Sequence, residues 1–113
     1  MSFVEIRSVD VDRVRSKMNE YAEWVFDTHP EVLEIVVFGS FADGTYAPGS
    51  DLDVFLLLKE SEKDVWDRVS DYLPGAFPVG LDLFPYTETE AEARRPSILL
   101  DAVERSTWRY RRG

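Results

Sequence analysis

The chain has 113 residues, of which 44% are hydrophobic and 31% charged, a balance typical of one globular domain rather than a disordered chain. Its formal net charge of -9 argues against broad binding to nucleic acid and favours a small substrate or a basic protein partner. The absence of cysteine excludes disulfides, thiolate catalysis and cysteine-ligated zinc.

The first predicted element is a helix over residues 11–28. Asp10 can cap it, and apolar residues follow at spacings of three and four, which is the pattern of one buried face. The helix is expected to end near His29, because the next residue is Pro30. His29 is the only histidine of the chain, and it is interpreted as a helix-end residue rather than a catalytic one.

A short, β-branched run over residues 33–38 predicts a buried strand that ends at Gly39 and Ser40. Gly39 allows a ligand to approach the backbone, and the Ser40 hydroxyl can donate to a phosphate oxygen. Residues 40–44 are expected to form a helical turn whose free N–H groups face an anion. The next loop carries Tyr46, for which a surface position is favoured over a role as a base-stacking lid.

The second predicted strand, residues 51–58, begins with Asp51 and Asp53. Because alternate residues of a strand share a face, the two carboxylates are expected side by side at the start of a central, otherwise apolar strand. Like charges this close raise each other's pKa unless a cation lies between them, so a bound metal ion is the simplest explanation. The alternative is a solvated turn in which Asp51 caps the loop and Asp53 forms a salt bridge.

A capping sequence at Ser61 and apolar residues at helical spacing predict a helix over residues 61–73, with Trp66 in the core. The next strand, residues 77–85, contains Asp82 as its lone charge. If this strand lies beside the preceding one, Asp82 joins the acidic pair. A three-carboxylate site then results.

The last part of the chain predicts helical segments and an edge strand. Thr87 to Glu90 form a capping-box pattern, and Pro96 favours either one interrupted helical segment or two short ones in this region. Residues 107–111 alternate apolar and basic residues, as a half-exposed edge strand does. Six of the thirteen basic residues lie within the last twenty positions, so an acidic body carries a basic tail.

The three acids suit Mg²⁺, which takes oxygen ligands and is usually held by one or two carboxylates together with water and substrate phosphates. Two such ions about 4 Å apart clamp the attacking and the leaving oxygen of a phosphoryl displacement. The third carboxylate can orient or deprotonate the attacking hydroxyl. Ser40 and nearby backbone amides would then hold a triphosphate.

Residues 30–85 resemble the polymerase-β-like nucleotidyltransferase superfamily, and the short chain resembles its minimal (MNT) branch. The resemblance is carried by Gly39-Ser40, ten intervening residues, Asp51-Leu52-Asp53-Val54 and the later Asp82. It implies an α+β (α/β) fold with a mixed β-sheet and helices packed on it, and a single minimal nucleotidyltransferase domain over residues 1–113.

The same resemblance implies an activity and a set of site residues. A nucleoside monophosphate, with AMP expected, would pass from a nucleoside triphosphate such as ATP to a hydroxyl acceptor, with two Mg²⁺ ions as cofactors. The residues implied as catalytic and metal-binding are Asp51, Asp53 and Asp82, and those implied as nucleotide-binding are Gly39 and Ser40.

One position departs from the family pattern. Where many minimal members have Gly-Ser-x-Ala-Arg-Gly, this chain has Asp43 in place of the arginine. A carboxylate near a triphosphate repels it, so weaker nucleotide binding or slower transfer is expected.

The resemblance also bears on partners. Minimal members often accompany a small helical HEPN protein as its antitoxin, and some attach AMP to a tyrosine of that toxin; an acidic body suits a basic toxin. Relatives that modify antibiotics usually have a second helical domain, for which 113 residues leave no room. The competing hypothesis is a non-catalytic antitoxin that masks its partner with the same fold. The sequence leaves open whether the protein forms a homo-oligomer.

The cytoplasm is the expected location. No apolar run approaches the roughly 20 residues of a membrane span, and Met1 to Glu5 lack the charged and then apolar pattern of a signal peptide.

Overall fold

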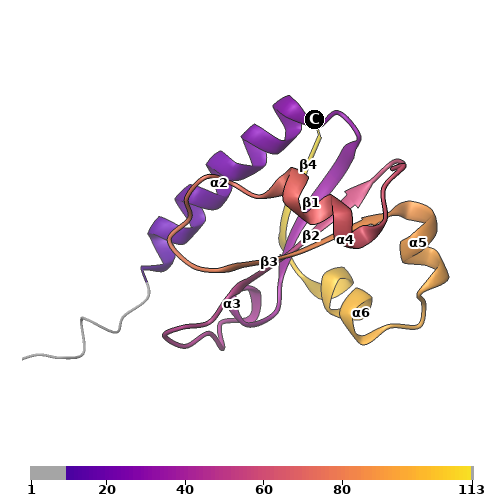
Figure 1. Ribbon diagram of the computed structural model, residues 1–113. Coiled ribbons are helices and arrows are strands. Elements are labelled where there is room, and N and C mark those ends of the chain that lie inside the picture. Colours follow the sequence, from indigo (N-terminus) through magenta and orange to yellow (C-terminus); the bar gives the residue numbers. More distant parts are fainter. Residues whose placement is uncertain (1–9, 113) are drawn as a thin grey trace, which may run out of the picture.

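The computed structural model describes residues 10–112. The segment considered for a signal peptide, Met1 to Glu5, lies outside this range. Within it, no helix is both long and apolar enough to cross a membrane. In chain order (Figure 1) the elements are α2 (Val11–Thr28), β1 (Val32–Phe38), α3 (Ser40–Asp43), β2 (Leu52–Leu58), α4 (Val65–Arg68), the 3₁₀ helix η1 (Val69–Tyr72), β3 (Leu81–Thr87), α5 (Glu88–Ala93), α6 (Ile98–Arg105) and β4 (Trp108–Arg111).

The four strands form one mixed sheet in the order β3-β2-β1-β4. β1 is antiparallel to both β2 and β4, whereas β2 and β3 are parallel. A parallel pair requires a crossover, and residues 59–80, which include α4 and η1, provide it. The expected α+β fold with a mixed sheet is confirmed. The expectation that the strand with Asp51 and Asp53 lies beside the strand with Asp82 is also confirmed.

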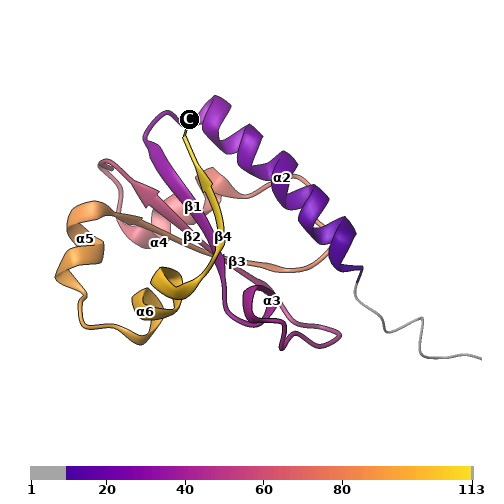
Figure 2. The ribbon, with the colours of Figure 1, turned by 180° about the vertical axis from the view of Figure 1, so that it is seen from behind.

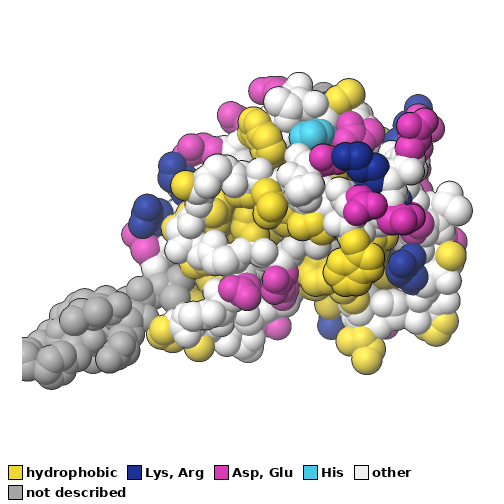
Figure 3. Space-filling view, in the orientation of Figure 1, with side chains coloured by type: hydrophobic (Ala, Val, Ile, Leu, Met, Phe, Trp, Pro, Cys, Tyr) yellow, Lys and Arg dark blue, Asp and Glu magenta, His cyan; other side chains and the backbone are white. Residues whose placement is uncertain are grey.

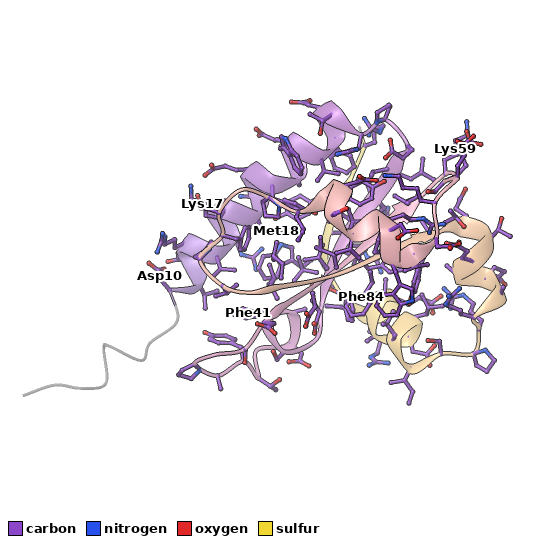
Figure 4. All side chains as sticks on the ribbon, in the orientation of Figure 1. Asp10, Lys17, Met18, Phe41, Lys59 and Phe84 are labelled. Carbon is purple, nitrogen blue, oxygen red and sulfur yellow. The ribbon has the colours of Figure 1, made fainter. Side chains whose placement is uncertain are left out.

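Helices cover both faces of the sheet. One face packs against the buried side of α2, and the other packs against α5 and α6 (Figures 1 and 2). Each face carries its own hydrophobic cluster. Met18 of α2 lies in the cluster on the α2 side, and Phe84 of β3 packs against the cluster on the side of α5 and α6 (Figure 4). Along β2, Val54 belongs to the α2 side and Phe55 to the α6 side, so β2 is the central strand that its two apolar faces predict.

The long helix α2 begins and ends as its sequence predicts. The Asp10 side chain accepts a hydrogen bond from the Arg13 N–H at 3.0 Å, and His29 is the C-cap residue. The last carbonyls are covered by Arg112, which donates to Phe26 and His29 at 3.0 Å each. A guanidinium at this position also complements the negative end of the helix dipole.

The crossover differs most from the prediction. Instead of one helix over residues 61–73, a single α-helical turn is followed by a 3₁₀ turn, and Asp64 is the N-cap residue. Ser61 does not cap the helix, because α4 begins only after Asp64. The Ser61 hydroxyl accepts hydrogen bonds from the Lys63 N–H at 3.2 Å and from Nε of Arg68 at 3.0 Å. Arg68 is only 3% exposed and occupies the inward side of α4. Trp66, two residues earlier, therefore faces solvent and is 87% exposed. The prediction of a core tryptophan is wrong.

Since Trp66 has little packing to lose, we expect Trp66→Ser to change the free energy of unfolding by less than about 0.5 kcal/mol. Urea denaturation of both proteins, with equal m-values, measures this difference. A loss above about 2 kcal/mol would mean that the indole makes packing contacts.

The remaining elements match the sequence apart from their limits. β1 begins one residue earlier than expected, and β3 spans Leu81–Thr87 rather than residues 77–85. The capping box of Thr87 and Glu90 is present, and Ser97 caps a separate second helix. β4 is the expected edge strand beside β1.

Candidate functional site

The turn after β1 is shaped by a carboxylate from the next strand. Gly39 has a positive φ of 77°, which side chains disfavour. A Cβ atom at this position would lie 2.3 Å from Oδ2 of Asp53, which is closer than any real contact. Glycine is therefore required here, because the Asp53 carboxylate packs directly against the backbone of the turn.

The strand register brings the acids to one edge of the sheet. Asp53 of β2 pairs with Phe38 on one side and with Asp82 of β3 on the other. Asp51 directly precedes β2, and its Oδ1 atom would lie 2.3 Å from a Cβ atom at Gly80. The two glycines thus leave room for the two carboxylates. In Figure 3, acidic side chains gather between α3 and β3.

The three carboxylates carry uncompensated negative charge. Burial raises the pKa of Asp53, and the charges of Asp82 and then Asp51 raise it further. Among residues 10–112, none of the three forms an ion pair with Lys or Arg. The salt-bridged alternative for Asp53 is therefore not observed. A set of oxygen donors without a cation suits a hard ion such as Mg²⁺.

The side chains do not enclose an ion in the conformation described. Within residues 10–112 no group of three acidic or histidine side chains converges closely enough to hold a metal ion. Asp51 lies against Gly80 and Asp53 against Gly39, and mutual repulsion favours this separation. Asp51 and Asp82 are exposed and can rotate. The donors fit Mg²⁺ in kind and in strand position, and these three side chains would have to turn toward one another to hold it.

The helical turn α3 offers fewer free N–H groups than expected. The N–H groups of Ala42 and Asp43 both donate to the Gly39 carbonyl, at 3.1 and 3.0 Å. The expectation of a row of amides facing an anion is wrong for these two. The Ser40 N–H, the Phe41 N–H and the Ser40 hydroxyl have no hydrogen-bond partner within the described part of the chain. These groups can still donate to a phosphate.

Asp43 has a structural role that the sequence did not indicate. Its Oδ1 atom accepts hydrogen bonds from Oγ1 of Thr45 at 2.6 Å and from the Thr45 N–H at 3.1 Å. These bonds lower the pKa of Asp43, which is exposed and charged at neutral pH. The turn leads to Tyr46, whose ring stacks on Phe41 at 5.0 Å with an angle of 3°. Tyr46 is thus half-buried, contrary to the favoured surface position.

Arg105, at the C-terminal end of α6, was not singled out by the sequence. It lines a cavity of about 280 Å³ together with Gly39, Ala42 and Asp43 from the turn. Its charge contributes to lowering the pKa of Asp43, after the hydrogen bonds from Thr45. The sequence signal was the basic tail, but the packing of α6 decides which of its arginines lies beside the turn.

Comparison with known proteins gives one family match and a similar solved structure. The chain matches the family described as nucleotidyltransferase domain over residues 16–106, which include the turn and all three acids. A crystal structure of a candidate nucleotidyltransferase from Sulfolobus solfataricus is similar, with a TM-score of 0.59 and 26% sequence identity. The match covers 89% of this chain and 80% of that chain. Among curated proteins there is no match.

Proposed function

Because the chain belongs to the nucleotidyltransferase domain family, we propose that it moves a nucleoside monophosphate, AMP in the first instance, from a nucleoside triphosphate to a hydroxyl group. The observation that carries this proposal is the contact of the Asp53 carboxylate with the Gly39 turn, beside Asp82 on the adjoining strand. A phosphate-binding turn and acidic residues must adjoin if one substrate is to contact both.

In the proposed reaction, the acceptor hydroxyl oxygen forms a bond to the α-phosphorus. The bond from this phosphorus to the α–β bridging oxygen breaks, and that oxygen leaves with pyrophosphate. Ser40 donates its hydroxyl hydrogen bond to a phosphate oxygen, and Asp82, exposed at the sheet edge, orients the acceptor hydroxyl and accepts its proton. Asp51, Asp53 and Asp82 are the residues that would hold Mg²⁺, which would supply positive charge to offset the phosphates.

The acceptor that we propose is a tyrosine of a basic, helical partner protein of the HEPN toxin type, in the cytoplasm. This part of the proposal rests on the resemblance of the turn and the acids to minimal nucleotidyltransferases. The net charge of -9 also favours a basic partner.

A second candidate function, a binding module without catalysis, is favoured by two observations. Asp43 places negative charge at the phosphate turn, and the acids do not enclose an ion in the described residues. In this case the protein would mask its partner while the acids are vestigial.

The two candidates are separated by incubating the protein with Mg²⁺ and each nucleoside triphosphate, alone and with candidate partner proteins, and then measuring masses. Transfer adds the mass of one or more nucleoside monophosphates to an acceptor. Asp51→Asn should abolish this addition while leaving complex formation unchanged. If the unmutated protein modifies nothing but still binds a partner, the binding module is the correct function.

Asp43→Asn tests the effect of the acid at the turn. The asparagine oxygen can keep both hydrogen bonds from Thr45 while the negative charge is lost. We therefore expect ATP to bind several-fold more tightly, by roughly the amount that one nearby, partly screened charge contributes. Isothermal titration calorimetry at low salt measures this change.

The matched control is Asp43→Ala, which removes both the charge and the hydrogen bonds that hold the turn. It should gain less affinity than Asp43→Asn, because the loop becomes less ordered. Equal or weaker ATP binding by Asp43→Asn would mean that the charge does not face the phosphates.

A further inference from the structure

The cavity between α3 and α6, here called the α3–α6 cavity, adjoins the candidate site but is not explained by it. The turn contributes Gly39 and Asp43 to its lining, and α6 and the residues after it contribute Arg105 and Ser106. Gly39 connects the two regions, because the Asp53 carboxylate packs against this same residue. A ligand held at the turn therefore has direct access to the cavity.

Among the described residues, Arg105 differs from the neighbouring Arg95 and Arg109 in having no ion-pair partner. Arg95 pairs with Glu104 at 2.8 Å, and Arg109 pairs with Glu34 at 3.1 Å. Within residues 10–112, the Arg105 side chain forms neither an ion pair nor a hydrogen bond, and it is exposed. In a protein with a net charge of -9, an unpaired guanidinium beside the site is a free anion-binding group.

Arg105 is also not needed to cap its own helix. Arg109 donates to the carbonyls of Val103 and Glu104 at 2.6 and 3.1 Å and so covers the C-terminal end of α6. The Ser106 hydroxyl donates to the Val37 carbonyl, which fixes this end of the helix to β1 two residues before Gly39. Arg105 thus extends from an anchored backbone position next to the turn.

The size of the cavity limits what it can hold. At about 280 Å³ it is just below the range of roughly 300–1,000 Å³ for pockets that enclose drug-sized ligands. A phosphate chain therefore suits this volume better than a complete nucleotide does. Since the arginine fork matches phosphate oxygens, the chemistry and the volume agree.

We propose that Arg105 binds the polyphosphate tail of the nucleoside triphosphate, the part that leaves as pyrophosphate, in the α3–α6 cavity. The inference rests on the proposed function and extends it to a residue outside the turn and the acids. Many minimal members have an arginine at the position of Asp43, which here is an acid. Arg105 supplies positive charge beside the turn from α6 instead. It is a substrate-binding residue that offsets the carboxylate across the cavity.

The test is calorimetric titration of the full chain with inorganic tripolyphosphate and separately with ATP, both with Mg²⁺. Arg105→Ala should weaken the binding of both ligands about 10-fold or more, since a charge-assisted hydrogen bond is lost. Arg105→Lys should retain part of the affinity, because it keeps the charge without the fork. The matched control is Arg13→Ala, which removes an exposed arginine of α2 whose side chain forms no ion pair within residues 10–112, and which should change the affinity less than about 2-fold.

Equal effects of Arg105→Ala and Arg13→Ala would overturn the proposal, and so would the absence of tripolyphosphate and ATP binding to the unchanged protein. The same experiments distinguish this proposal from the proposed transfer reaction. Tripolyphosphate binding that depends on Arg105, without any nucleotidyl transfer, would support the tail site and contradict the enzyme. Transfer that is unaffected by Arg105→Ala would support the enzyme and contradict the tail site.

Discussion

Asp53→Asn is expected to reduce nucleotidyl transfer about 100-fold or more and, at the same time, to raise the melting temperature of the protein. Transfer falls because the substitution removes a carboxylate from the centre of the proposed site, between the turn and Asp82. Stability rises because the charged form of Asp53 is disfavoured by burial and by two neighbouring carboxylates. Product mass and thermal unfolding at pH 7 measure the two effects.

The sign of the pH dependence comes from the raised pKa of Asp53. Between its unfolded value near 3.8 and its higher folded value, the folded protein binds the proton more tightly, so stability falls as pH rises. Asp53→Asn removes this contribution. The matched control is Asp101→Asn on α6, an exposed acid that lies outside the site and should change neither property. A lower melting temperature for Asp53→Asn would show that the carboxylate stabilises the fold.

The second large effect is expected at Glu90, where substitution by Ala should cost about 3 to 5 kcal/mol of stability. Glu90 accepts two hydrogen bonds from the guanidinium of Arg68, at 2.6 and 2.8 Å, and Arg68 is only 3% exposed. Removing the carboxylate leaves a buried positive charge without its partner. It also removes the capping box that Glu90 forms with Thr87 at the start of α5. Urea denaturation measures the loss.

The Glu90 contribution also depends on pH. Hydrogen bonds from Arg68 are the main cause that lowers the pKa of Glu90 to about 2. Its stabilisation is therefore complete above the ordinary value of 4.5 and is lost as pH falls through about 2. Glu92→Ala is the control on the same helix, since Glu92 only approaches Arg95 at the surface, at 3.5 Å. Equal losses for the two variants would mean that the buried pair adds nothing.

Local sequence patterns predicted most of the fold correctly. The caps of α2 and α5, the apolar faces of β2 and the edge strand β4 depend on residues close together in the chain, so periodicity and capping chemistry suffice to find them. The prediction of one continuous helix in the crossover was wrong, and contacts between residues far apart in the chain accompany the shorter helix. Arg68 reaches across to Glu90 and to the Pro85 carbonyl, and neither contact is visible in the local pattern.

The candidate site could be predicted in its strand positions but not in its side-chain details. The spacing of Asp51 and Asp53 and the lone Asp82 were enough to expect neighbouring acids, which the register of β2 and β3 confirms. The Thr45 contacts of Asp43 and the position of Arg105 depend on a turn conformation and on helix packing. No pattern of residue types specifies these features.

The crossover also affects the order in which the site assembles during folding. The Gly39 turn and Asp53 belong to one antiparallel pair, β1 and β2, joined by a local loop. Asp82 joins them only when residues 59–80 have carried β3 to the far side of β2, and pairing at such separation closes slowly. A chain in which β3 is still unpaired would hold the turn and two of the three acids. Completion of the acidic cluster thus depends on the crossover, so chains in which β3 has not yet paired would lack the third acid of the proposed Mg²⁺ site.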